Sequence, residues 1–147
     1  MKITALFLLL SLIISGQKSY SQTTVDPIQG RWVVTARNCS SGVPARDGFR
    51  IGRDEAKMSF FGGKYDGVTK IDGCNYWMSG KYETRGHMLR FSEITSASNC
   101  GNPPVAINST FFFVVEEGLL KIYFPVNYYS ESCPRGDMLE AVYTLSN

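Results

Sequence analysis

Short runs of β-branched and aromatic residues, separated by clusters of Gly, Pro, Asn and Asp, recur along most of the chain. This pattern is typical of antiparallel all-β domains, and no apolar period of 3.6 residues persists for the length of a helix. We therefore expect a mainly β fold, a small antiparallel barrel or sandwich of about eight strands with at most one short helix. The expected strands are 31–36, 49–52, 56–61, 65–71, 77–84, 88–94, 111–115, 119–124 and 138–145.

The clearest predicted hairpin pairs 77–84 with 88–94 through a short connection that contains a glycine. Such connections suit a tight β-turn. Strict alternation along the second strand would place Leu89, Phe91 and Glu93 on one face. We therefore expect these three side chains to share one side of the sheet.

The N-terminus has the layout of a secretory signal peptide. Residues 5–14 form an almost unbroken apolar run behind the basic Lys2, and small polar residues follow. The run is shorter than the roughly 20 residues that a membrane-spanning helix needs. We therefore expect cleavage after Ser21 and export to a secreted or periplasmic location, without membrane insertion.

The predicted organisation is a signal peptide at 1–21, a polar N-terminal tether at 22–29 and one domain at 30–147. The chain has 15 basic and 13 acidic residues. Loss of Lys2 and Lys18 with the leader makes the two numbers equal. A near-neutral chain gives no support for nucleic acid or anionic lipid as a partner, since both favour a basic patch.

Four cysteines, Cys39, Cys74, Cys100 and Cys133, follow the leader. An even number of cysteines in an exported chain indicates two disulfides. Three pairings are open to four cysteines. A zinc site is disfavoured because the chain lacks the closely spaced cysteine pairs on which such sites are built.

The stretch from Ile71 to Cys100 resembles the META domain, the HslJ-like family of small secreted or envelope proteins. The family pattern is a Gly-Cys-Asn turn, then Gly-x-Tyr, a Gly turn, Leu-x-Phe, an Ile-Thr/Ser segment and a second cysteine. In this chain the pattern reads Gly73-Cys74-Asn75, Gly80-Lys81-Tyr82, Gly86, Leu89-Arg90-Phe91, Ile94-Thr95-Ser96 and Cys100.

The resemblance carries several expectations. It implies that Cys74 pairs with Cys100, which leaves Cys39 to pair with Cys133. Gly80 is expected to permit a bulge or a close backbone approach. Family members carry a helix after the second cysteine, but this chain has Asn102-Pro103-Pro104 there, so we expect a single helical turn at most.

The sequence does not predict a catalytic or metal site. His87 is the only histidine, and it falls in a predicted hairpin turn. The acidic pairs Asp54-Glu55 and Glu116-Glu117 lie at predicted turns, where we expect them to be solvated. No cofactor is implied, and we expect the protein not to be an enzyme.

Three aromatic residues are the candidates for a binding surface: Trp77, beside the Gly-Cys-Asn turn, and Tyr128 and Tyr129, in a long loop. Exposed aromatic side chains are favoured at binding surfaces. Core packing is the competing explanation for each of them.

Together these features predict an exported, monomeric, non-catalytic META-like β domain that acts in binding or in envelope or stress support. An alternative is a lipocalin-like barrel that carries a small apolar ligand. A hydrolase is the least favoured hypothesis. The expected partner is therefore an unknown protein or a small apolar ligand.

Overall fold

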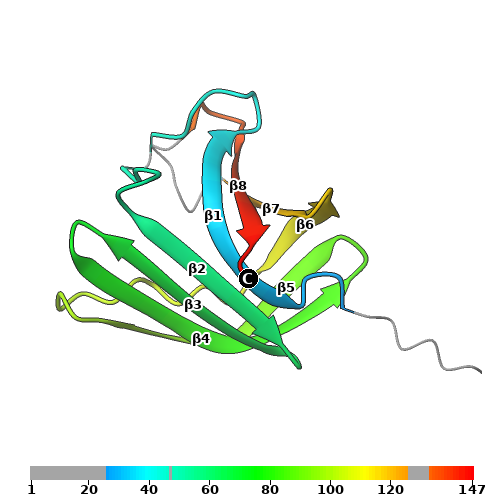
Figure 1. The fold of residues 1–147 in the computed structure, drawn as a ribbon, viewed down its shortest axis with the longest axis horizontal. Coiled ribbons are helices and arrows are strands. Elements are labelled where there is room, and N and C mark those ends of the chain that lie inside the picture. Colours follow the sequence, from blue (N-terminus) through cyan, green and yellow to red (C-terminus); the bar gives the residue numbers. More distant parts are fainter. Residues whose placement is uncertain (1–25, 47, 126–132) are drawn as a thin grey trace, which may run out of the picture.

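The computed structural model describes residues 26–46, 48–125 and 133–147. These residues form an antiparallel barrel of eight strands (Figure 1). The predicted signal peptide and the residues Tyr128 and Tyr129 lie outside this part of the chain. The strands are β1 (Gly30–Cys39), β2 (Glu55–Phe61), β3 (Lys64–Ile71), β4 (Cys74–Arg85), β5 (Met88–Ser98), β6 (Thr110–Glu116), β7 (Leu119–Pro125) and β8 (Met138–Leu145).

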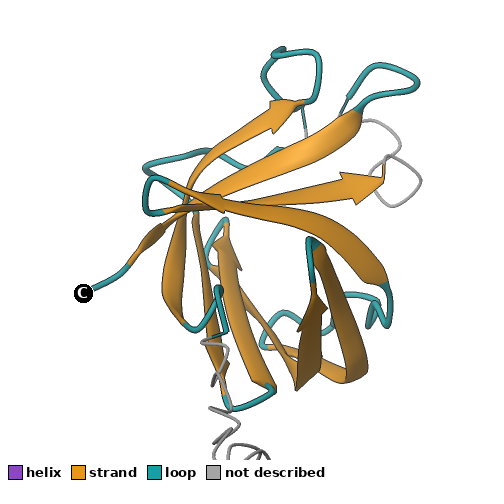
Figure 2. Cartoon of the chain, turned by 90° about the vertical axis from the view of Figure 1, so that its right-hand side faces the viewer, coloured by secondary structure: helices purple, strands orange, loops and turns teal. Residues whose placement is uncertain are grey.

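Each strand pairs with the next along the chain, and β1 pairs with β8 to close the barrel. The predicted mainly β fold is thereby confirmed, and the structure selects a barrel over a sandwich. No helix occurs among the described residues (Figure 2). The segment after Cys100 has no regular structure up to Thr110, because Pro103 and Pro104 lack the N–H groups that a helix interior needs.

The two ends of the barrel differ in their connections. At one end, hereafter the turn end, two-residue turns join β2 to β3, β4 to β5 and β6 to β7. At the other end, hereafter the loop end, lie the long β1–β2 connection and the start of the β5–β6 connection. Glycines with positive φ stand in each of the three turns, for example Gly86 at 58°. These tight turns leave the longer segments gathered at the loop end.

The turn end is filled by apolar side chains. Ile28 is fully buried, and its carbonyl oxygen accepts a hydrogen bond from the Trp32 indole N–H at 2.8 Å. Asp26 accepts a hydrogen bond from the Tyr82 hydroxyl. Residues 26–29, the last part of the segment predicted as a polar tether, therefore pack against the core and are hereafter called the plug. The apolar side chain of Ile28 is the part of the plug that is buried.

A series of aromatic contacts leads from this plug toward the loop end. Phe60 meets Tyr82 edge-on, with ring centroids 4.9 Å apart, and Tyr65 meets Phe91 edge-on at 4.7 Å. Such edge-to-face pairs are favoured by the ring quadrupole. Tyr82 and Phe91 are also direct partners across the β4–β5 hairpin, so the stretch from Ile71 to Cys100 supplies part of the barrel core.

Both disulfides lie at the loop end. Cys39, the last residue of β1, bonds to Cys133 before β8, and Cys74, the first residue of β4, bonds to Cys100 after β5. The two predicted disulfides are confirmed, with the pairing that the resemblance implied. Figure 1 shows the segments that follow β1 and precede β8 side by side, as the Cys39–Cys133 bond requires.

Two local predictions were wrong. The expected short strand at 49–52 is absent, and only an isolated bridge joins Ile51 to Asp54 there. Strict alternation on β5 also fails, because the β4–β5 register shifts between Ser79 and Lys81. Glu93 adopts a φ of 54° at this bulge, so it leaves the face occupied by Leu89 and Phe91.

Candidate ligand-binding site inside the barrel

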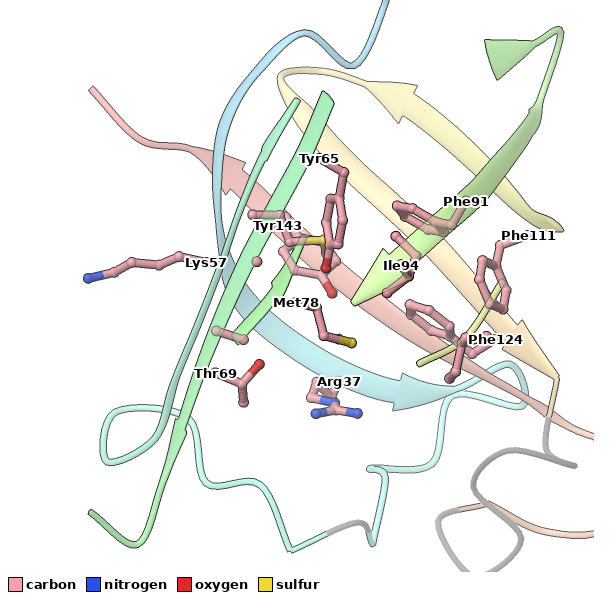
Figure 3. A pocket seen from close by; sticks show the side chains of 14 residues that line it. Arg37, Lys57, Tyr65, Thr69, Met78, Phe91, Ile94, Phe111, Phe124 and Tyr143 are labelled. Atoms are coloured by element: carbon pink, nitrogen blue, oxygen red, sulfur yellow. The ribbon is translucent and has the colours of Figure 1, made fainter. Parts of the chain in front are cut away.

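The loop-end half of the barrel interior contains a cavity of about 120 Å³. Most strands contribute side chains to it, because alternate residues of each strand point inward. Its lining is mainly apolar, which fits the general character of small-molecule sites. The lining residues, shown in Figure 3, are Arg37, Ala56, Lys57, Met58, Tyr65, Gly67, Thr69, Met78, Phe91, Ile94, Ile107, Phe111, Phe124 and Tyr143.

Gly67 makes room for the Tyr65 ring in the wall of the cavity, because a Cβ at this position would stand 2.3 Å from the Tyr65 hydroxyl oxygen. Gly67 pairs with Met58 of β2 on one side and with Met78 of β4 on the other. All three positions face inward, but Gly67 contributes no side chain. The two methionines beside Gly67 have flexible, polarizable side chains that adapt to irregular shapes, so this wall can adjust to a bound molecule.

Aromatic rings form the opposite wall. Phe111 lies 5.8 Å from Phe91 and 4.9 Å from Phe124, measured between ring centroids. Phe111 and Phe91 are buried, whereas Phe124 is only partly buried. The aromatic wall therefore extends from the closed core to the loop end.

The β4–β5 bulge lies next to this wall. A side chain at Gly80 would place its Cβ 2.6 Å from Ile94 Cδ1 and 2.8 Å from the Ser92 carbonyl oxygen. The β5 backbone can therefore approach β4 only at a glycine, as was expected for Gly80. The bulge turns Ile94 inward to line the cavity.

Arg37 enters the cavity through an irregularity in β1. Val34 pairs with Tyr143, but Ala36 pairs with Val142, so one extra residue stands in β1 between them. This shift places Arg37 opposite the inward-facing, fully buried Ala141. Without the bulge, alternation from Val34 would have turned Ala36 inward and Arg37 outward.

The cavity has polar groups as well as apolar walls. Figure 3 shows the side chains of Arg37, Thr69 and Tyr65 pointing into the space that Met78 also faces. The Lys57 side chain points away from it, and its Nζ atom forms an ion pair with Glu55 at 2.9 Å. Arg37 is therefore the cation that the barrel turns toward the cavity interior.

Of the three candidate binding-surface residues, Trp77 lies in the described part of the chain, and it does not line this cavity. Trp77 is 43% exposed on the outer side of β4, where it borders a second hollow of about 570 Å³, hereafter the outer groove. Arg31, Val68 and Ser79 also line the outer groove, and so do Met58, Gly67 and Met78 of the cavity wall. Tyr128 and Tyr129 lie outside the described residues. The structure thus leaves Trp77 on the outside of the barrel.

The polar residues considered for catalysis are dispersed. His87 is exposed at the turn end, and its Nδ1 atom lies 3.2 Å from the Phe113 carbonyl oxygen. Asp54 was expected to be solvated, but it is buried and accepts hydrogen bonds from the backbone N–H groups of Arg50 at 2.7 Å and Asp72 at 3.4 Å. This carboxylate therefore ties the β1–β2 connection to the β3–β4 turn.

Within the described parts of the chain, no three His, Cys, Asp or Glu side chains are grouped so that they could hold a metal ion. The same residues include no helix long and apolar enough to cross a membrane. The chain matches no protein-family model, no curated protein and no solved structure. The site must therefore be interpreted from its own geometry.

Proposed function

We propose that this protein is exported, with its leader cleaved after Ser21, and that it binds a small, mostly apolar ligand inside the loop-end half of its barrel. The observation that carries this proposal is the cavity between the paired positions Met58, Gly67 and Met78 and the aromatic wall. Two disulfides are typical of an oxidising, extracytoplasmic compartment. The proposed activity is binding without catalysis.

The size of the cavity sets the size of the ligand. Barrels of eight strands have an interior that side chains fill or that holds one small ligand. An apolar cavity of about 150 Å³ accepts benzene or xenon, and the volume here is about 120 Å³. A molecule with one ring or a short chain is the class of ligand that fits.

The relation to the META family remains a proposal. The residues that carry the resemblance supply β4, β5 and the Cys74–Cys100 bond. They also place Met78 and Ile94 beside the cavity. We propose that a META-like hairpin forms one wall of a ligand-binding barrel.

The methionines allow a direct test. Met58 and Met78 line the cavity and also the outer groove, whereas Met88 and Met138 are 45% and 40% exposed elsewhere on the barrel. Methionine methyl groups labelled with ¹³C can be followed by NMR while xenon or benzamide is added to residues 22–147. The Met58 and Met78 signals should shift in a saturable way, and the Met88 and Met138 signals should not.

A filled cavity provides the control. Ala56→Leu adds volume to the lining of the cavity, which Ala56 borders without lining the outer groove. Ala97→Leu adds the same volume at an exposed position of β5. We expect Ala56→Leu to weaken the shifts of Met58 and Met78 and Ala97→Leu to leave them unchanged. Saturable shifts confined to Met88 and Met138, or an absence of shifts with both probes, would contradict the proposed function.

A further inference from the structure

We propose that the ligand is a small carboxylate whose apolar part is about the size of one ring, and that Arg37 binds its carboxylate group. This inference rests on the proposed function and adds the chemical class of the ligand. It is carried by the bulge that turns Arg37 into the barrel and by the position of Arg37 in the cavity lining.

The first step of the argument is the direction of the Arg37 side chain. Regular pairing of β1 with β8 would have pointed this side chain to solvent. The extra residue between Val34 and Ala36 turns it toward the barrel interior instead. Bulges are over-represented next to functional sites, where they redirect a side chain.

The second step is the orientation of the guanidinium. Its carbon lies 5.1 Å from the centroid of the Phe49 ring, which belongs to the β1–β2 connection. Such contact with an aromatic ring restrains the guanidinium. Five N–H donors in a fixed fork allow one guanidinium to bind a carboxylate through two parallel hydrogen bonds while it contacts its protein neighbours.

The third step concerns the other charged group of the lining. Lys57 is held by its ion pair with Glu55 and points away from the cavity. Thr69, in contrast, offers a hydroxyl group on the same side as Arg37 (Figure 3). A carboxylate beside Arg37 and Thr69 would leave its apolar part between Met78 and Phe111, which is the arrangement that the proposed ligand class requires.

Benzoate and benzamide test this inference because they have nearly the same shape and differ in charge at pH 7. Affinities measured by titration calorimetry for residues 22–147 should favour benzoate by at least about tenfold, the factor that corresponds to a charge-assisted hydrogen bond. Arg37→Met should abolish this preference by weakening benzoate about tenfold or more. Benzamide affinity should change by less than about threefold.

Lys57→Met is the matched control, since it removes a charge at the rim that does not point inward. It should leave the preference for benzoate intact. Arg37→Lys keeps the charge but loses the fork, so it should retain a smaller preference for benzoate. If Arg37→Met fails to fold, the ratio of the benzoate and benzamide affinities in the native protein still shows whether the barrel prefers a carboxylate.

The failures of the two proposals are distinguishable. Equal affinities for benzoate and benzamide in the native protein, unchanged in Arg37→Met, would overturn the carboxylate inference and leave the ligand-binding function standing. Loss of the benzoate preference in Lys57→Met instead of Arg37→Met would also overturn it. Absence of binding by both compounds and by xenon would overturn the proposed function itself.

Discussion

The ring of Tyr65 lies directly over the α-carbon of Gly67, two residues along β3, so that a Cβ at Gly67 would stand 2.3 Å from the Tyr65 hydroxyl oxygen and 2.9 Å from Cζ. Tyr65 is itself buried against Phe60 and Phe91. A side chain at Gly67 must therefore displace this ring from the core. The absence of a Cβ lets this ring pack against the wall between Met58 and Met78.

Gly67→Ala should destabilise the protein by about 1–3 kcal/mol, the usual cost of overpacking a core, and should weaken binding of benzamide. Urea unfolding and calorimetry measure the two effects. Tyr65→Phe removes the closest clashing atom, so the double variant should be less destabilised than the sum of the two single variants. Full additivity would show that Gly67 and Tyr65 do not share this contact.

The Ile28 plug should contribute strongly to stability. Ile28→Ala removes fully buried methyl and methylene groups and should lower the free energy of unfolding by about 2–4 kcal/mol. Val105→Ala is the matched control, because Val105 is 84% exposed. Equal urea midpoints for Ile28→Ala and the native protein would show that residues 26–29 are a tether after all.

Sequence patterns predicted the strands well because each strand and turn is specified locally. The bounds of Met138–Leu145 were predicted as observed, since alternating side chains and flanking polar residues mark both ends. Closure of the barrel was not predictable, because pairing of β1 with β8 joins the two ends of the domain.

The site was harder to predict than the strands. Nothing in the composition around Val34 and Ala36 signals a bulge, so the inward direction of Arg37 follows only from the register with β8. Asp54 was misjudged because its hydrogen-bonding partner Asp72 comes from a different turn. Met58 falls in the strand expected at 56–61, but the prediction of a strand does not distinguish packed core from cavity.

The disulfides should differ in their contribution to stability. Cys39 and Cys133 are 94 residues apart and Cys74 and Cys100 are 26 apart. The chain-entropy model gives losses of about 4–5 and about 3–4 kcal/mol on replacement by alanine pairs. Urea unfolding of the two double variants tests this order, and a larger loss for Cys74→Ala/Cys100→Ala would contradict it.

The stability of the protein at alkaline pH should depend on Tyr123. Burial raises the pKa of Tyr123 to about 12, aided by its hydrogen bond to Glu140. The unfolded chain ionises this phenol near its ordinary pKa of about 10, so it binds fewer protons than the folded chain above that pH. The contribution of Tyr123 to stability is present below pH 10 and is lost as the pH rises toward 12.

Tyr123→Phe should therefore lose less stability between pH 10 and 12 than the native protein does. Urea midpoints at intervals across this range provide the measurement. Parallel curves for the two proteins would show that Tyr123 ionises equally easily in the folded and unfolded states.

A crystal structure of residues 22–147 with bound benzoate tests the central claim most directly. We predict electron density for the ring between Met58, Met78 and Phe111, with both carboxylate oxygens within hydrogen-bond distance of the Arg37 guanidinium. Benzoate bound only in the outer groove beside Trp77, or a barrel that excludes benzoate at saturating concentration, would contradict the account.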